Sequence, residues 1–184
     1  MTITTTARLR LREFTLDDAA FALRLLNEPS FIANIADRGV RSIADAERYL
    51  AEGPMASYAR HGFGLWLVEI AETDTPAGMC GLIRRDGLEH PDIGYAFVPE
   101  HWGRGYAREA ARATVALAAG RFGMQRLLAI VSQANEPSSR LLLELGFRDE
   151  GLIRLRDDAE PLRLFGRDLD ANRELELAPA ASDL

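Results

Sequence analysis

One stretch of the chain places two glycines and an arginine where a predicted strand gives way to a helix. Residues 98–118 read VPEHWGRGYAREAARATVALA, so Gly103 and Gly105 stand directly before an alanine-rich helical segment. The first backbone N–H groups of a helix have no partner within it, and the helix dipole favours negative charge there. Glycines let a bound anion approach the backbone because they carry no β-carbon. The stretch therefore predicts an anion-binding site at a helix start.

Two common nucleotide-binding loops do not fit this stretch. A dinucleotide-binding fingerprint needs a third glycine three residues after the second, and Arg108 stands there instead. A phosphate-binding P-loop needs a glycine–lysine pair, whereas all 22 basic residues of this chain are arginines. The predicted site must therefore serve a different anionic ligand.

The segments around this loop show the periodicities of strands and helices. Arginines alternate with leucines over residues 7–14, which predicts a half-buried strand whose arginine face is solvated or, as an alternative, binds an anion. Thr15 or Asp17 is the expected cap of the next helix, and a second helical region over 42–62 is interrupted near Gly53-Pro54. Further strands are expected over 63–70, 77–85, 92–98, 126–132, 151–155 and 162–169, and further helices over 104–122 and 134–147. This order predicts one α+β domain that contains an antiparallel meander.

Composition narrows the class of protein. The formal net charge of −6 argues against a general nucleic-acid binder, which needs a cationic surface. No window approaches the roughly 20 apolar residues of a membrane span, and the start of the chain lacks the apolar segment of a signal peptide. We therefore expect a cytoplasmic protein with neither nucleic acid nor membrane as a partner. Its single cysteine, Cys80, lies in an apolar run and is expected to be buried rather than nucleophilic.

Two motifs together resemble those of the GNAT superfamily of acetyl-coenzyme A-dependent N-acetyltransferases. They are GYAFVPEHWGRGYAREAA (94–111) and NEPSSRLLLELGF (135–147), and RLRLREFTLDDA (8–19) extends the resemblance over most of the chain. The branch that the sequence most resembles is that of the ribosomal-protein N-terminal acetyltransferases. The resemblance implies one acyltransferase domain over 1–177, with a mixed, mostly antiparallel sheet splayed in the middle and flanked by helices. A flexible tail is expected over 178–184.

The resemblance also implies acetyl-coenzyme A as the cosubstrate, and no metal. The backbone N–H groups of 102–107 would hold the pyrophosphate, with Arg104 and Arg108 either adding charge or remaining solvated. A free N–H near Val98 would stabilise the developing oxyanion, and Asn135 would bond the pantetheine arm, cap its helix, or do both. Trp102 stands where the superfamily usually has glutamine or arginine. The implied cofactor-binding residues are Phe97, Val98, Trp102, Gly103, Arg104, Gly105, Tyr106, Ala107, Asn135 and Ser138.

Acetylation of an amine needs a base and a proton donor for the departing thiolate. Many members of the superfamily use a tyrosine as the donor, but Leu142 occupies the corresponding position. The ribosomal branch is thought to use the serine that is Ser138 here, although a serine in a first helical turn can simply satisfy the backbone. Asp92 lies close to the position of a base in some relatives, although aspartate after a proline more often caps a turn. Ser138 and Asp92 are the predicted catalytic residues.

The remaining ionisable residues of these regions have two interpretations each. Glu100 and His101 are solvent-facing loop residues or, for His101, a base with a suitable ordinary pKa. Glu109 is expected to stabilise the positive end of its helix. Asp37 and Arg38 orient the acceptor or form a salt bridge within their loop.

The main functional hypothesis is acetyl transfer to a primary amine by direct attack in a ternary complex. The acceptor is a protein N-terminus or a small molecule such as a polyamine or an aminoglycoside. The alternative is a non-catalytic module that binds an acyl-coenzyme A as a sensor, which the missing tyrosine favours and Ser138 opposes. A monomer or a homodimer is expected.

Overall fold

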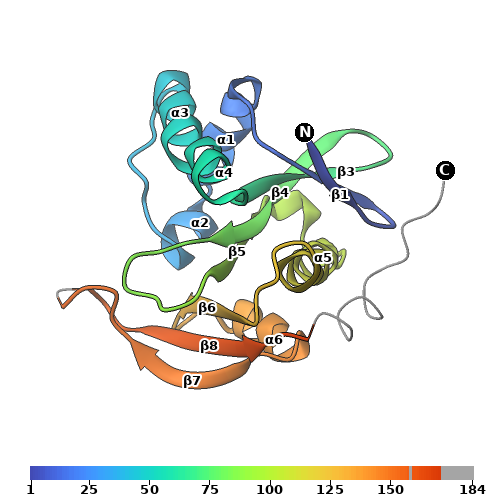
Figure 1. The fold of residues 1–184 in the computed structure, drawn as a ribbon. Helices are drawn as coiled ribbons and strands as arrows, with labels where there is room; N and C mark the ends of the chain where they lie inside the picture. The colour runs from blue at the N-terminus through green and yellow to red at the C-terminus, as the bar shows by residue number, and fades with distance from the viewer. Residues whose placement is uncertain (158, 171–184) are drawn as a thin grey trace.

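Eight strands in the described residues form one sheet, in the order β1-β2-β3-β4-β5-β6-β8-β7. The computed structural model describes residues 1–157 and 159–170, so the expected boundary at 177 and the tail over 178–184 lie outside them. Neighbouring strands run antiparallel except for β5 and β6, which run parallel. The expected α+β class, with a mixed and mostly antiparallel sheet, is confirmed (Figure 1).

The first five strands are antiparallel to one another in sequence order, and the last three of them, β3 to β5, form the predicted meander. The five strands are β1 (Thr2–Thr5), β2 (Leu9–Arg12), β3 (Leu65–Ile70), β4 (Thr75–Ile83) and β5 (Asp92–Phe97). β1 is not predicted from the sequence, because its short threonine-rich stretch lacks apolar alternation. It forms by pairing with β2, from Thr2 opposite Arg12 to Thr5 opposite Arg10.

The sheet splays between β5 and β6 (Arg126–Ser132), as the resemblance implies. Within the described part of the chain, β5 and β6 pair at a single position, where Asp92 lies opposite Leu128. The Leu128 N–H donates to the Pro91 carbonyl at 2.9 Å. On its other side β6 pairs along its length with β8 (Leu162–Asp168), which in turn pairs with β7 (Arg148–Ile153). The inner edge of β5 therefore diverges from its neighbour, and its backbone groups can pair with an extended ligand.

Four helices cover one face of the meander (Figure 1). They are α1 (Ala19–Leu26), α2 (Pro29–Asn34), α3 (Ile43–Leu50) and α4 (Ala56–His61). Thr15 is the N-cap of the 3₁₀ turn that leads into α1, which confirms one of its two predicted caps. The interruption predicted near Gly53-Pro54 is a π-helical turn over Ala51–Met55 that joins α3 to α4. α2 is not predicted from the sequence. None of the helices in the described residues is long and apolar enough to cross a membrane.

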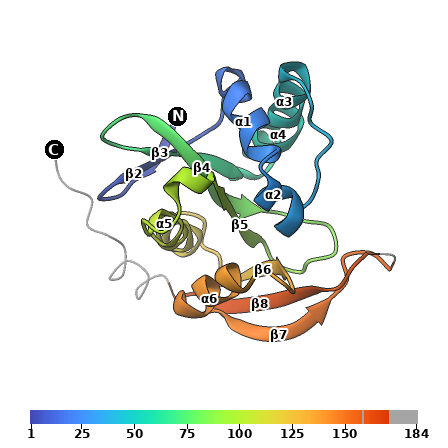
Figure 2. The same cartoon turned by 180° about the vertical axis from the view of Figure 1, so that it is seen from behind.

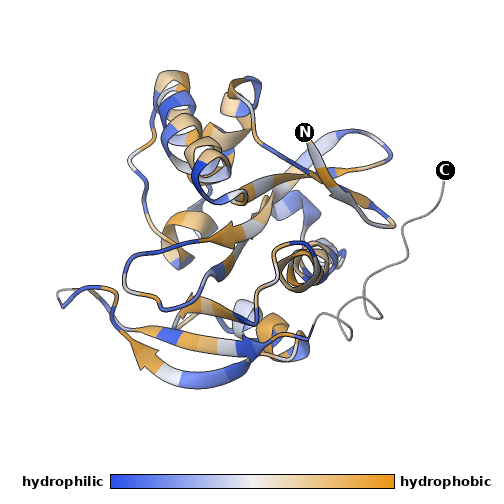
Figure 3. Ribbon diagram, in the orientation of Figure 1, coloured by the Kyte–Doolittle hydropathy of each residue, from blue (hydrophilic) through white to orange (hydrophobic). Residues whose placement is uncertain are grey.

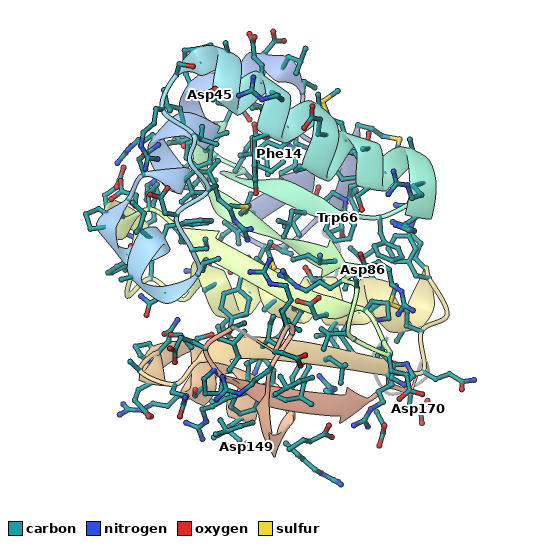
Figure 4. All side chains as sticks on the ribbon, turned by 90° about the vertical axis from the view of Figure 1, so that its left-hand side faces the viewer. Phe14, Asp45, Trp66, Asp86, Asp149 and Asp170 are labelled. Carbon is teal, nitrogen blue, oxygen red and sulfur yellow. The ribbon has the colours of Figure 1, made fainter. Side chains whose placement is uncertain are left out.

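Helices α5 (Tyr106–Gly120) and α6 (Glu136–Glu144) lie against the other face (Figure 2). Two clusters of buried side chains fill the interior, one with α5 and α6 and one with α1 to α3. Trp66 belongs to the first cluster and Phe14 to the second, so β3 and its neighbours are buried on both faces (Figure 4). Hydrophobic residues accordingly concentrate on the central strands and hydrophilic residues on the loops (Figure 3).

The arginine stripe of β2 is largely occupied by carboxylates. Arg10 and Arg12 each contact Glu69 of β3 at 2.7 Å, and Arg12 also contacts Asp18 at 2.8 Å. Glu69 is only 4% exposed. The predicted strand face is therefore solvated only in part, with the Arg10 and Arg12 side chains 30% and 23% exposed. The alternative of an anion-binding stripe is disfavoured, because these two cations already have partners.

Candidate functional site

A cavity of about 900 Å³ lies around the diverging edge of β5. Its walls come from α1–α3, the facing strands β4 to β6, the glycine loop and α6. Side chains alternate across β5, so Ile93, Tyr95 and Phe97 pack with the α5 cluster, while Ala96 packs with the α1–α3 cluster. The cavity therefore reaches residues from both faces of the sheet.

The glycine loop forms the predicted helix start. Gly105 is the N-cap of α5 with φ of 80°, and Gly103 has φ of 72°. Glycine adopts this left-handed region without the steric cost that other residues meet. A β-carbon at Gly103 would meet no atom within 4 Å, so the backbone conformation rather than crowding requires this glycine. The loop leaves the first N–H groups of α5 facing the cavity, which Gly103, Gly105, Tyr106 and Ala107 line.

The two arginines of this loop differ in their position relative to the cavity. Arg104 does not line the cavity in the described residues, and its carbonyl accepts a hydrogen bond from Arg8 Nη1 at 2.9 Å. Arg108 lines the cavity but forms an ion pair with Glu144 of α6. Trp102 is 54% exposed, and its indole Nε1 donates to the Phe97 carbonyl at 2.7 Å. Of these side chains, those of Arg108 and Trp102 are already engaged within the protein.

Glu109 fastens the start of α5 to the first hairpin. Thr6 Oγ1 and Arg8 Nε donate to its two carboxylate oxygens at 2.6 and 2.7 Å. Partial burial raises the pKa of Glu109, but these hydrogen bonds outweigh burial and hold the pKa below its usual range. The Arg8 guanidinium also lies over the Tyr106 ring, 4.9 Å from its centroid. Glu109 therefore positions the glycine loop, beyond the helix-dipole role predicted for it.

The N–H of Val98 itself is not free. This group donates to the Ala77 carbonyl of β4 at 3.1 Å, and Val98 is fully buried and does not line the cavity in the described chain. Successive residues of an antiparallel strand direct their N–H groups to opposite sides. Because Val98 bonds to β4, the N–H groups of Phe97 and Tyr95 point away from β4 and towards the divergence from β6. Phe97 lines the cavity.

Asn135 and Ser138 meet at the start of α6. Asn135 is the N-cap, and its Oδ1 accepts a hydrogen bond from the Ser138 N–H at 3.2 Å. Both residues line the cavity. The Ser138 hydroxyl lies 2.8 Å from the Tyr95 hydroxyl. Burial raises the pKa of Tyr95, and its hydrogen bond with Ser138 opposes this only in part.

Tyr95 is the residue that sequence reasoning missed. It lies on β5, whereas the tyrosine of many relatives is expected on α6, where Leu142 is fully buried. The alternation of β5 places Tyr95 on the same face as Phe97, and this signal was present in the sequence. That face meets the start of α6 only in the folded chain, so nothing in the sequence indicates that Ser138 is the hydrogen-bond partner of Tyr95.

Asp92 is a buried carboxyl held by one arginine. It is 1% exposed, and Arg85 Nε lies 2.9 Å from each of its oxygens. Burial raises the pKa of Asp92 to about 6, against the opposing effect of the Arg85 charge. Asp92 begins β5 and its side chain contacts Arg85 rather than capping the preceding turn. Both residues line the cavity.

Several other candidates are engaged elsewhere. Glu100 pairs with Arg24 at 2.6 Å and Asp37 pairs with Arg41 at 2.5 Å. Cys80 is fully buried beside Thr114 at 3.2 Å, and burial raises the pKa of its thiol to about 12. A thiol in this state is a poor nucleophile.

His101 differs from those residues because it lines the cavity and its Nδ1 is buried. That nitrogen has no hydrogen-bond partner among residues 1–157 and 159–170. The His101 ring lies 6.2 Å from the Tyr106 ring, between centroids.

Sequence comparison assigns this arrangement to a class. The acetyltransferase (GNAT) domain family matches residues 8–148. The chain therefore belongs to the GNAT acetyltransferase family. The two motifs at 94–111 and 135–147 resemble those of its members.

Individual relatives agree with this assignment. The uncharacterized N-acetyltransferase YoaA of Bacillus subtilis is 29% identical over 150 residues, which cover 81% of this chain and 84% of YoaA. RimL, a ribosomal L7/L12 α-N-protein acetyltransferase solved with coenzyme A, has a TM-score of 0.77 at 17% identity, over 93% of this chain and 99% of its own. A spermidine N-acetyltransferase SpeG chimera from Vibrio cholerae and hSSAT has a TM-score of 0.72 at 18% identity, over 92% and 99%. The two structural likenesses concern the fold.

Proposed function

We propose that this protein moves the acetyl group of acetyl-coenzyme A to a primary amine by direct attack within a ternary complex. The observation that carries the proposal is the cavity at the divergence of β5 and β6. It brings together a backbone N–H cradle, a pair of hydroxyls and a buried carboxyl. Acetyl-coenzyme A, when bound, supplies an activated acetyl thioester, and the chain must supply the rest.

The cavity fits coenzyme A at its glycine-loop end. The left-handed Gly103 and Gly105 direct the N–H groups at the start of α5 towards the space where a pyrophosphate would lie. The diverging edge of β5 provides N–H groups for the extended pantetheine arm, which adds to the sheet as a strand does. Asn135 caps α6 through Oδ1 and keeps its amide N–H₂ group for that arm.

The oxyanion donor is the Phe97 N–H, next to the Val98 N–H that is bonded to β4. It points into the divergence by the alternation of β5, and Phe97 lines the cavity. A backbone N–H fixed in a sheet stabilises developing negative charge without having to reorient. The Trp102 indole N–H donates to the Phe97 carbonyl. The edge of β5 therefore presents the Phe97 N–H to the ligand, while the carbonyl oxygen of the same residue is already bonded.

The proton donor to the departing thiolate is the Ser138–Tyr95 pair. The Ser138 hydroxyl lies at the start of α6, and the Tyr95 hydroxyl at 2.8 Å can replace a proton that it gives up. Burial keeps Tyr95 protonated, because it raises the pKa of the phenol. This pair fills the role that Leu142 cannot perform.

The base is Asp92, acting through water in the cavity. An amine at neutral pH is mostly protonated and must lose a proton before it can attack. A carboxyl with a pKa of about 6 is largely ionised at neutral pH, yet holds a proton far better than an ordinary aspartate. Arg85 fixes its orientation through Nε. Asp92 faces the α1–α3 side, opposite to Tyr95, so the acceptor enters from that side.

The alternative of a non-catalytic sensor rests on Leu142 in the place of the usual tyrosine. The Ser138–Tyr95 pair weakens that support, because it offers hydroxyl donors from other elements. A sensor also has no use for a buried carboxyl on the acceptor side. The enzyme is therefore the function that the site supports best.

Release of free coenzyme A thiol from acetyl-coenzyme A tests the proposal. Three acceptor sets are compared, namely peptides that begin with alanine or serine, polyamines, and aminoglycosides. We expect acceptor-dependent release with at least one set, lost in Asp92→Asn and retained in Asp86→Asn, whose carboxyl is exposed on the neighbouring turn. Binding of coenzyme A without release in any set would favour the sensor.

A further inference from the structure

Strand β5 divides the cavity into a cofactor side and an acceptor side. The acceptor side is the part towards α1–α3, where the side chain of Asp92 lies. Its polar lining residues in the described chain are Ser30, Asn34, Arg38, Tyr49, Arg85 and Asp92. The glycine loop and the Ser138–Tyr95 pair lie on the cofactor side, at the other end of β5. A charge on the acceptor side therefore faces the acceptor rather than the coenzyme A phosphates.

The acceptor side carries positive charge that the protein does not neutralise. Among the described residues that line the whole cavity, Asp92 pairs with Arg85 and Glu144 pairs with Arg108. Arg38 on the acceptor side has no ion-pair partner within residues 1–157 and 159–170. The acid next to it, Asp37, pairs with Arg41 instead. This excess of positive charge is confined to the acceptor side, because the whole chain has a net charge of −6.

Arg85 also keeps donors for a ligand. It holds Asp92 through Nε alone, and its two Nη groups have no hydrogen-bond partner in the described part of the chain. Tyr49 of α3 lies near both arginines. Burial raises the pKa of its phenol, and the charges of Arg38 and Arg85 oppose that rise. Arg38, which is exposed, and Arg85, which is half-buried, thus both line the cavity and both oppose the rise in the pKa of Tyr49.

We propose that the acceptor amine carries an anionic group, a carboxylate or a phosphate, which Arg38 and the Nη groups of Arg85 bind. Guanidinium groups suit such oxyanions because their planar N–H donors match two oxygens at once. This inference rests on the proposed function, since it describes the acceptor of that reaction. It disfavours polyamines and aminoglycosides, whose additional positive charges would face both arginines.

The contact between Arg85 and Asp92 also limits the spacing of the two groups in the acceptor. Asp92 is the proposed base and must lie near the amine, while Arg85 touches Asp92 directly. The amine and the anionic group are therefore separated by only a few bonds. An N-terminal residue followed by an acidic residue satisfies this spacing, and so does a small phosphorylated amine.

The test uses acceptors that differ only in charge. Turnover is measured by thiol release with the C-terminally amidated dipeptides Ser-Asp, Ser-Asn and Ser-Lys, with O-phosphoethanolamine against ethanolamine, and with spermidine. We expect the anionic member of at least one matched pair to have a kcat/KM at least about tenfold above its neutral counterpart. Comparison of the dipeptides with O-phosphoethanolamine shows whether the site accepts a carboxylate or a phosphate.

Variants assign the preference to Arg38. In Arg38→Gln the ratio of kcat/KM for the anionic and neutral members falls about tenfold. Arg60→Gln removes the same charge from an exposed helical position outside the cavity and keeps the ratio. The affinity for coenzyme A, measured by calorimetry, reports that each variant is folded. Equal turnover of the matched acceptors, a preference for Ser-Lys or spermidine, or a ratio unchanged in Arg38→Gln would overturn the inference.

A second readout separates this inference from the proposed function. If no acceptor releases thiol, the same dipeptides are titrated by calorimetry into the protein saturated with coenzyme A. Tighter binding of Ser-Asp than of Ser-Asn, lost in Arg38→Gln, would support the anion site while the transfer function fails. Equal or absent binding would overturn the anion site.

Discussion

Asp92→Asn is expected to change how the stability of the protein depends on pH. In the folded chain this carboxyl is 1% exposed and burial raises its pKa from 3.8 to about 6, despite the Arg85 charge. In the unfolded chain it titrates near its ordinary value. The folded state therefore holds the proton more tightly, and the stabilisation from this group is fully present below the unfolded pKa. It is lost as the pH rises through the folded pKa.

The size of this effect follows from the two pKa values. The gap between 3.8 and about 6 corresponds to about 3 kcal/mol of unfolding free energy in total. About 1 kcal/mol of it is already lost at about pH 4.5, so about 2 kcal/mol remains to be lost between there and about pH 8. Asparagine does not titrate, and Arg85 stays charged throughout this range. Removing its partner therefore shifts the stability of the variant by an amount that does not depend on pH.

Urea unfolding at these two pH values measures the effect. The free energy of unfolding of wild type, relative to that of Asp92→Asn, should fall by about 2 kcal/mol from the lower to the higher pH. Taking this difference removes the contributions of all other titrating groups. Asp86→Asn is the control, since Asp86 is exposed on the turn just before β5 (Figure 4). A difference that is the same at both pH values, or that grows in favour of wild type, would refute the assignment of Asp92 as a buried carboxyl with a raised pKa.

Four further single substitutions have distinct expected outcomes. Gly105→Ala places a β-carbon on a residue with φ of 80°, which strains the backbone of the glycine loop. The affinity for coenzyme A, measured by calorimetry, should fall about tenfold. An unchanged affinity would contradict the role of this loop in binding the pyrophosphate. Ser138→Ala and Tyr95→Phe should each lower kcat by about tenfold or more, and the double variant should be little worse than the poorer single one, because the two hydroxyls share one hydrogen bond. Losses that multiply would show that they act independently. Cys80→Ala should retain full kcat, since the thiol is buried with a pKa raised to about 12; loss of turnover in a folded variant would reopen an acyl-cysteine route.

Much of the fold could be predicted because local signals agree with the final structure. The two glycines before α5 and the Asn135 cap of α6 have the conformations that their residue types favour. The meander from β3 to β5 follows from apolar strands separated by turn residues. β1 and α2 could not be predicted in this way, because a four-residue strand and a six-residue helix carry little periodicity.

The site was harder to predict because it depends on which way each group points. The resemblance implies a free N–H near Val98 without naming the residue. The bond of the Val98 N–H to Ala77 follows from the register of β5 on β4, which the sequence does not state. Asp92 is a candidate from the sequence, but its burial and its partner Arg85 come from the packing of a turn against the sheet edge. Tyr95 was missed for the same reason, because its partner lies 43 residues away.

Mass spectrometry of a complete reaction tests the central proposal most directly. Wild-type protein is incubated with acetyl-coenzyme A and the best acceptor from the charge-matched set, and both the acceptor and the intact protein are weighed. Direct attack in a ternary complex predicts one acetyl group on the acceptor amine for each thiol released, with no acetyl group on the protein. Thiol release without acetylated acceptor, or an acetyl group that accumulates on Cys80 before the acceptor is added, would contradict the proposed reaction.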